Sequence, residues 1–171
     1  MSAPGSSPSF DRLPQPHSNS ALSEMTPLSQ WKHRLYNWLA RREYSAREAK
    51  DRLLRSGCPA SLATVLIDDC CDKKLIDDQR FVEHYTRSLL RRGYGASYIR
   101  YQMQQKGVDE QLVQCALAAI DWRDQIAYTL RRRYGDRTVS LASQRGFLYR
   151  KGYNAQHLHS YFGRENTEDM D

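Results

Sequence analysis

Apolar residues recur along the chain at the spacing of an α-helix. Trp31, Leu35 and Trp38 fall at i, i+4 and i+7, so a helix would carry all three on one face. Trp122 and Ile126 begin a similar apolar face later in the chain. No segment sustains the alternation of apolar and polar residues that is typical of a half-buried strand. The pattern predicts an all-α protein.

Residues that begin and end helices stand between these apolar segments. Ser45 and Glu48 have the spacing of a capping box, in which each side chain bonds the other residue's backbone N–H. Gly57 is placed to end that helix in a left-handed conformation, and Pro59 is tolerated at the start of the next one. Asp77 or Asp78 is the natural N-cap of a later helix.

The same order of residue types occurs twice, about fifty residues apart, which is typical of tandem helical units. A third and less regular copy runs from Tyr134 to Gly152, as expected for a terminal unit. In the first two copies, Arg41, Arg42, Tyr44, Gly57 and Leu62 correspond to Arg91, Arg92, Tyr94, Gly107 and Leu112.

We therefore predict three tandem three-helix units, at residues 29–75, 76–120 and 121–163. Each unit is too small to bury its apolar face alone, so stacking of neighbours would stabilise the array. Residues 1–28, which hold many prolines and serines, are predicted to form a disordered tail, and residues 164–171 an acidic tail.

The chain has 171 residues and a net charge of +6. The two predicted tails carry −1 and −3, which leaves +10 on residues 29–163 and indicates an acidic or polyanionic partner. The positive residues are mostly arginine, which suits bidentate contact with phosphate or carboxylate. We expect a cytoplasmic protein without a membrane partner, because the sequence shows neither a spanning apolar run nor a signal peptide.

The residue spacing favours neither an enzyme nor a metal protein. The four cysteines form no C-x-x-C pair and have no matching histidines, so we expect buried, reduced thiols, no metal and no cofactor. Asp77 and Asp78 are adjacent at a helix start and have no nucleophile or histidine beside them in sequence, so capping is favoured over acid–base catalysis.

Paired arginines at the end of each unit's first helix are the main candidates for partner contact. They could offset the helix dipole, or they could form a row of guanidinium groups for acidic side chains or DNA phosphates. The tyrosines that follow them suit a core or hinge role, or stacking on an exposed base. The candidate binding residues are Arg41, Arg42, Arg47, Arg91, Arg92, Tyr94, Tyr98, Arg100, Arg132, Arg133 and Arg150.

Three motifs in this order resemble the RecX regulatory proteins, which modulate the bacterial RecA recombinase. Segment 42–48 resembles the family's Arg-x-Tyr/His-Ser-x-x-Glu signature, and segment 75–81 resembles its Leu-Asp-Asp-x-Arg-Phe motif. Segment 92–108 resembles its Gly-Tyr-Gly, Ile-Arg and Lys-Gly block. With segment 150–153, the resemblance covers about residues 31–162.

The resemblance implies a non-enzymatic, elongated and curved helical protein. Such a protein lodges in the groove of the RecA filament, contacts single- or double-stranded DNA weakly, and suppresses strand exchange, ATP hydrolysis and coprotease activity in DNA repair. We expect a monomer. The alternative is a stand-alone basic helical DNA-binding protein, and a third possibility is a helical adaptor for another acidic protein.

Overall fold

The computed structural model describes residues 26–163, which form nine α-helices and no strand. The prediction of an all-α protein built from three tandem three-helix units is confirmed. The first helix begins at Pro27, so the end of the segment predicted as a tail is helical. Residues 1–25 and the predicted acidic tail lie outside the described residues.

Unit 1 packs three helices around a small apolar core. Thr26 caps the first helix through its side chain, which accepts a hydrogen bond from the Ser29 backbone N–H. Leu35 and Leu53 lie in the core and are fully buried. The helices are α1 (Pro27–Leu39), α2 (Ala46–Arg55) and α3 (Ala60–Asp72).

Unit 2 has the same order of helices and its own core. The Asp77 side chain accepts from the Arg80 backbone N–H at 3.1 Å, which confirms Asp77 as the N-cap. Ile99 and Met103 are fully buried in the core of this unit. The helices are α4 (Asp78–Arg91), α5 (Ala96–Gln105) and α6 (Glu110–Ala118).

Unit 3 repeats the arrangement. The Ser140 side chain caps its second helix by accepting a hydrogen bond from the Ser143 backbone N–H. Ile126 and Leu148 are fully buried in its core. The helices are α7 (Trp122–Tyr134), α8 (Leu141–Arg150) and α9 (Ala155–Phe162).

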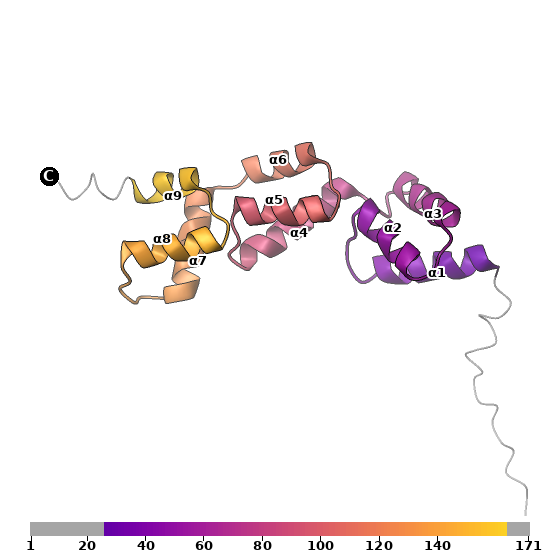
Figure 1. The fold of residues 1–171 in the computed structure, drawn as a ribbon, viewed down its shortest axis with the longest axis horizontal. Helices are drawn as coiled ribbons and strands as arrows, with labels where there is room; N and C mark the ends of the chain where they lie inside the picture. Colours follow the sequence, from indigo (N-terminus) through magenta and orange to yellow (C-terminus); the bar gives the residue numbers. More distant parts are fainter. Residues whose placement is uncertain (1–25, 164–171) are drawn as a thin grey trace, which may run out of the picture.

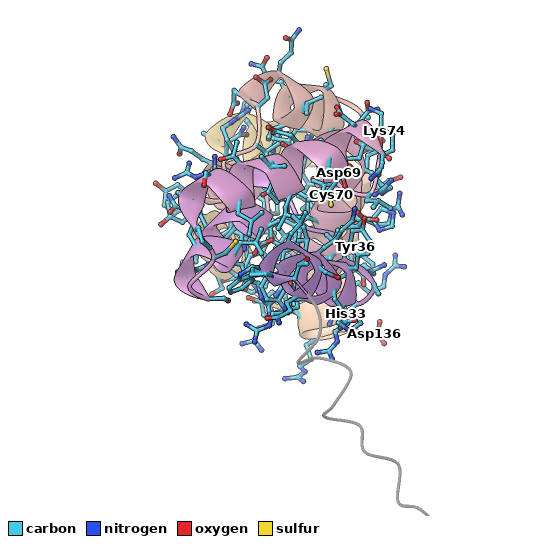
Figure 2. All side chains as sticks on the ribbon, turned by 90° about the vertical axis from the view of Figure 1, so that its right-hand side faces the viewer. His33, Tyr36, Asp69, Cys70, Lys74 and Asp136 are labelled. Carbon is cyan, nitrogen blue, oxygen red and sulfur yellow. The ribbon has the colours of Figure 1, made fainter. Side chains whose placement is uncertain are left out.

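The three units follow one another in a row, with unit 2 in the middle (Figure 1). Each unit has a separate core, and Trp122 packs against the cores of both unit 2 and unit 3. The unit 1 end faces the viewer in Figure 2, where Tyr36 and Asp69 are labelled. There Lys32 of α1 pairs with Asp69 of α3 at 3.3 Å, so an ion pair ties the outer helices of the unit together.

The glycines that we predicted as helix stops do adopt left-handed backbone conformations. The φ angles are +91° at Gly57, +66° at Gly107 and +87° at Gly152. A residue with a side chain would be strained at each of these positions.

Two predictions about single residues were wrong in part. Cys58 and Cys70 are buried, but Cys71 is only half-buried and Cys115 is exposed. Ser45 accepts from the Glu48 backbone N–H at 3.1 Å, as a capping box requires. The Glu48 carboxylate does not turn back to Ser45, because it bonds two cationic side chains instead.

Candidate partner-binding groove

A groove of about 860 Å³ runs along α4 and draws residues from all three units. Unit 1 contributes the loop between α1 and α2, and unit 3 contributes the outer side of α7. Five cationic side chains line the groove, and Glu43 is the single carboxylate among its lining residues. The cations are Arg42, Arg91, Arg92, Lys106 and Arg132.

A second, smaller pocket of about 400 Å³ shares Arg92 and Arg132 with this groove. It adds Arg133 and Lys151 and has no carboxylate among its lining residues. The two hollows therefore form one continuous basic surface, which we call the basic groove. Such a concentration of one charge attracts anionic partners before contact.

Aromatic rings accompany the cations in the basic groove. Tyr85 and Tyr128 line the larger hollow, and Phe147 lines the smaller one. Tyr128 is 46% exposed, so its ring is available to a bound molecule. Interleaved rings and cations suit a nucleic-acid strand as well as a protein surface.

The first junction, between units 1 and 2, is held by a half-buried carboxylate. Glu48 accepts two hydrogen bonds from the Arg42 guanidinium, at 2.9 and 3.1 Å, and another from the Lys106 ammonium group. Its side chain is 12% exposed. Burial alone would raise the pKa of Glu48, but the hydrogen bonds from the two cations hold that pKa below its ordinary value.

Further polar contacts cross the first junction. The Ser45 hydroxyl donates to the Lys106 carbonyl oxygen at 2.7 Å, and the Ala46 backbone N–H donates to an Asp78 carboxylate oxygen at 2.9 Å. The Arg80 guanidinium pairs with Glu43 at 2.8 Å. Both glutamates of this junction are therefore neutralised by cations of the same protein.

The second junction, between units 2 and 3, is a contact of backbone on backbone. The Gly95 N–H donates to the Lys151 carbonyl at 2.8 Å, and the Ser97 N–H donates to the Gly152 carbonyl at 2.9 Å. A Cβ atom on Gly95 would lie 2.6 Å from the Gly152 carbonyl oxygen. Only glycine fits at position 95 while the two units remain this close.

Two tyrosine rings fill the space beside this contact. Tyr94 and Tyr98 stack with their ring centroids 4.0 Å apart. Two cations flank the Tyr94 ring, with the Lys151 Nζ 4.3 Å and the Arg92 Cζ 5.5 Å from its centroid. The second junction thus combines aromatic stacking with cation–π contacts.

The structure brings some predicted site residues together and separates others. Arg41, Arg47, Arg100 and Arg150 do not line the basic groove. Arg100 pairs with Glu110 at 2.9 Å on the far side of α5, a pairing that sequence spacing did not suggest. The predicted residues that line the groove are Arg42, Arg91, Arg92, Arg132 and Arg133, while Tyr94 and Tyr98 lie at the second junction.

Sequence reasoning missed both lysines and the aromatic rings of the groove. Lys106 and Lys151 each precede the glycine that ends a unit's second helix, and this repeated Lys-Gly pair was a usable signal. We assigned a role to the glycines and overlooked the lysines. Tyr128 carried no such signal, because only the folded chain brings it into the same groove lining as Tyr85.

The described helices offer no sign of a metal centre or a membrane span. Within residues 26–163, no three histidine, cysteine or acidic side chains gather as metal ligands would. Over the same residues, no helix is both long and apolar enough to cross a bilayer.

Comparison with known proteins decides the family. Residues 77–117 match the family model described as RecX, second three-helix domain, which corresponds to unit 2. A regulatory protein RecX from Acidithiobacillus ferrooxidans is 32% identical over 136 residues, which cover 77% of this chain and 88% of the relative. The chain belongs to the RecX family. A second RecX, from Xanthomonas citri, is 29% identical over 154 residues and covers 86% of this chain and 93% of its own length.

The fold agrees with a solved RecX structure as well. The crystal structure of RecX from Lactobacillus salivarius matches with a TM-score of 0.66 at 20% identity, over 82% of this chain and 97% of that one. RecX family membership supports a regulatory role.

Proposed function

We propose that this RecX-family chain binds the RecA filament on DNA and inhibits its strand exchange, ATP hydrolysis and coprotease activity in the cytoplasm. The observation that carries the proposal is the basic groove, which crosses all three units and presents seven cationic side chains. A groove of this length can contact several repeating elements of a filament at once. The family resemblance supplies the identity of the filament.

Inhibition would follow from occlusion. An elongated body of three linked units bridges neighbouring filament subunits, and bridging opposes the subunit movements that accompany ATP turnover (Figure 1). The cations would meet acidic side chains of the filament, DNA phosphates, or both. In this proposal the contact residues are Arg42, Arg91, Arg92, Arg132 and Arg133, and the protein acts as a monomer.

The alternative is a stand-alone DNA-binding protein, which the basic groove and its aromatic rings also favour. The two functions differ in what they require of the partner. A filament regulator binds RecA-coated DNA much more tightly than naked DNA at the same salt concentration. A stand-alone binder prefers naked DNA and loses affinity steeply as salt rises.

The test of inhibition is RecA ATP hydrolysis on single-stranded DNA, measured as this protein is added. We expect hydrolysis to fall as the filament becomes saturated. The double variant Arg91→Glu with Arg92→Glu should restore hydrolysis, because it reverses two charges in the groove. Unchanged hydrolysis at saturating, salt-controlled binding of the wild-type protein would refute inhibition.

A further inference from the structure

The two junctions join equivalent positions of the repeat but carry different charges. Ser45 and Gly95 are the N-cap residues of the second helix in their units, so Glu48 and Tyr98 occupy the same position, three residues later. Lys106 and Lys151 are both the C-cap residue of a second helix. The cations of the first junction therefore recur at the second, whereas the carboxylate that neutralises them does not.

The other glutamate of the first junction is also absent from the second. Glu43 and Gly93 both directly precede the tyrosine that begins the junction. The Gly93 position lies against Thr129, whose methyl group would be 3.0 Å from an added Cβ. A side chain at position 93 would crowd Thr129 and would be strained at a φ of +79°, so no acidic side chain stands at this position of the second junction.

Unit 3 adds two more cations, Arg132 and Arg133, to the second junction. Counted from the N-caps Asp77 and Asp121, Arg132 and Arg133 stand where α4 has Ser88 and Leu89. Together with Arg92 and Lys151 they surround the smaller hollow of the basic groove.

None of these four cations forms an ion pair with a carboxylate in the described part of the chain. Arg132 donates to the Arg91 carbonyl oxygen, and Lys151 lies 3.5 Å from the Arg92 carbonyl oxygen. Arg133 lies over the Phe147 ring, 5.8 Å from its centroid. Four like charges around one hollow repel one another, and a bound anion would offset that repulsion.

We infer that the second junction is a binding site for phosphate groups, which take the place that the Glu48 carboxylate holds at the first junction. The site lies within the groove on which the proposed function rests, and it names the chemistry recognised there. A single carboxylate could not neutralise the four cations around this hollow. A guanidinium group can donate two parallel hydrogen bonds to two oxygens of one phosphate group. Phe147 and Tyr128 add ring faces for the bases of a strand.

The phosphate groups could belong to a nucleic-acid strand or to a free polyphosphate. The experiment measures binding of the whole chain, without RecA, to a fluorescent oligothymidylate by anisotropy. Inorganic tripolyphosphate and polyglutamate of matched charge serve as competitors. We expect both phosphate ligands to bind, and a much tighter oligothymidylate would identify the strand as the source.

The first variant removes the two cations that only the second junction has. Arg132→Gln with Arg133→Gln should weaken phosphate binding about tenfold and make it less dependent on salt. The matched control is Arg55→Gln with Arg123→Gln, two exposed arginines outside the groove that remove the same net charge. The control should stay within about twofold of the wild type.

The second variant supplies the missing counter-ion. Tyr98→Glu places a carboxylate where the first junction has Glu48, and Tyr98→Gln has the same shape without the charge. We expect the glutamate variant to bind phosphate about fivefold more weakly than the glutamine variant. Comparing these two variants separates the effect of charge from any loss of the stacked ring.

Three results would overturn the site. These are equal binding by the groove variant and its control, equal binding by the two Tyr98 variants, and polyglutamate competing as well as the phosphate ligands. Phosphate binding as expected, with RecA hydrolysis unaffected by the protein, would refute the proposed function and leave the site standing. Inhibition of RecA without this phosphate binding would refute the phosphate site and leave the proposed function standing.

Discussion

The two junctions of this protein join equivalent positions of the repeat by different contacts. At the first, Glu48 neutralises Arg42 and Lys106, and these ion pairs help to hold units 1 and 2 together. At the second, Gly95 and the backbone of unit 3 make the structural contact. The cations there have no carboxylate partner within the described residues, and we propose that they contact a bound phosphate.

This difference shows how a tandem repeat can separate stability from binding. Repetition alone placed an arginine and a lysine at both junctions. The residue three positions after the N-cap decides whether those cations are neutralised. It is a glutamate in unit 1 and a tyrosine in unit 2.

The largest expected effect comes from crowding the second junction. Gly95→Ala should lower the free energy of unfolding by about 3–5 kcal/mol, because the new Cβ would force two backbones apart and break their hydrogen bonds. At the equivalent position of the first junction, Ser45→Ala loses only hydroxyl hydrogen bonds and should cost about 1–2 kcal/mol. Urea unfolding followed by circular dichroism measures both.

Gly146→Ala is the control for this prediction. Gly146 lies inside α8, and an added Cβ would meet only the flexible end of the Arg150 side chain, at 3.4 Å. Alanine should therefore stabilise the helix by about 0.5–1 kcal/mol. If Gly95→Ala were as well tolerated as this control, the backbone contact at the second junction would not be what joins units 2 and 3.

A smaller loss is expected from removing the counter-ion of the first junction. Glu48→Gln should lower the free energy of unfolding by about 1–3 kcal/mol at pH 7, because it leaves two cations without their carboxylate. The pKa of Glu48 is lower in the folded chain than in the unfolded one. Its contribution is therefore complete above pH about 4.3 and is lost as the pH falls through the lower folded value.

Unfolding experiments at pH 7 and pH 3 check this dependence. The gap in stability between the wild type and Glu48→Gln should be wide at pH 7 and narrower at pH 3. A gap of the same size at both values would mean that the ionised carboxylate does not stabilise the first junction.

The smallest effect on stability is expected from the cations of the second junction. Arg132→Gln with Arg133→Gln should change the free energy of unfolding by less than about 0.5 kcal/mol, because neither arginine has a carboxylate partner within the described residues. Thermal unfolding beside the Arg55→Gln and Arg123→Gln control tests this. A large loss would assign these arginines to folding and not to binding.

Local signals in the sequence were enough to predict the helices and the repeat. Asp77 and Gly107 act through their nearest neighbours, so cap and turn rules identify them correctly. The partners of Glu48 could not be found in this way. Lys106 lies in another unit, and only stacking of the units makes that pairing.

The candidate site was predictable only in part for the same reason. The arginine pairs were predicted as site residues because they repeat along the sequence. The sequence did not show which arginines are neutralised. Arg100 pairs with Glu110, whereas Arg132 has no carboxylate partner within the described residues. The sequence shows how many cationic side chains the chain has, but not where they lie in the folded protein. The packing of three units decides which of them line one groove.

The most direct test of the central claim is co-sedimentation of this protein with RecA filaments on single-stranded DNA, beside naked DNA at matched salt. We predict that the wild type and the Arg55→Gln, Arg123→Gln control pellet with filaments far more than with naked DNA. The Arg132→Gln, Arg133→Gln variant should bind filaments about tenfold more weakly while remaining folded. Equal filament binding by that variant and the control would contradict the claim that the second junction is kept free for the partner.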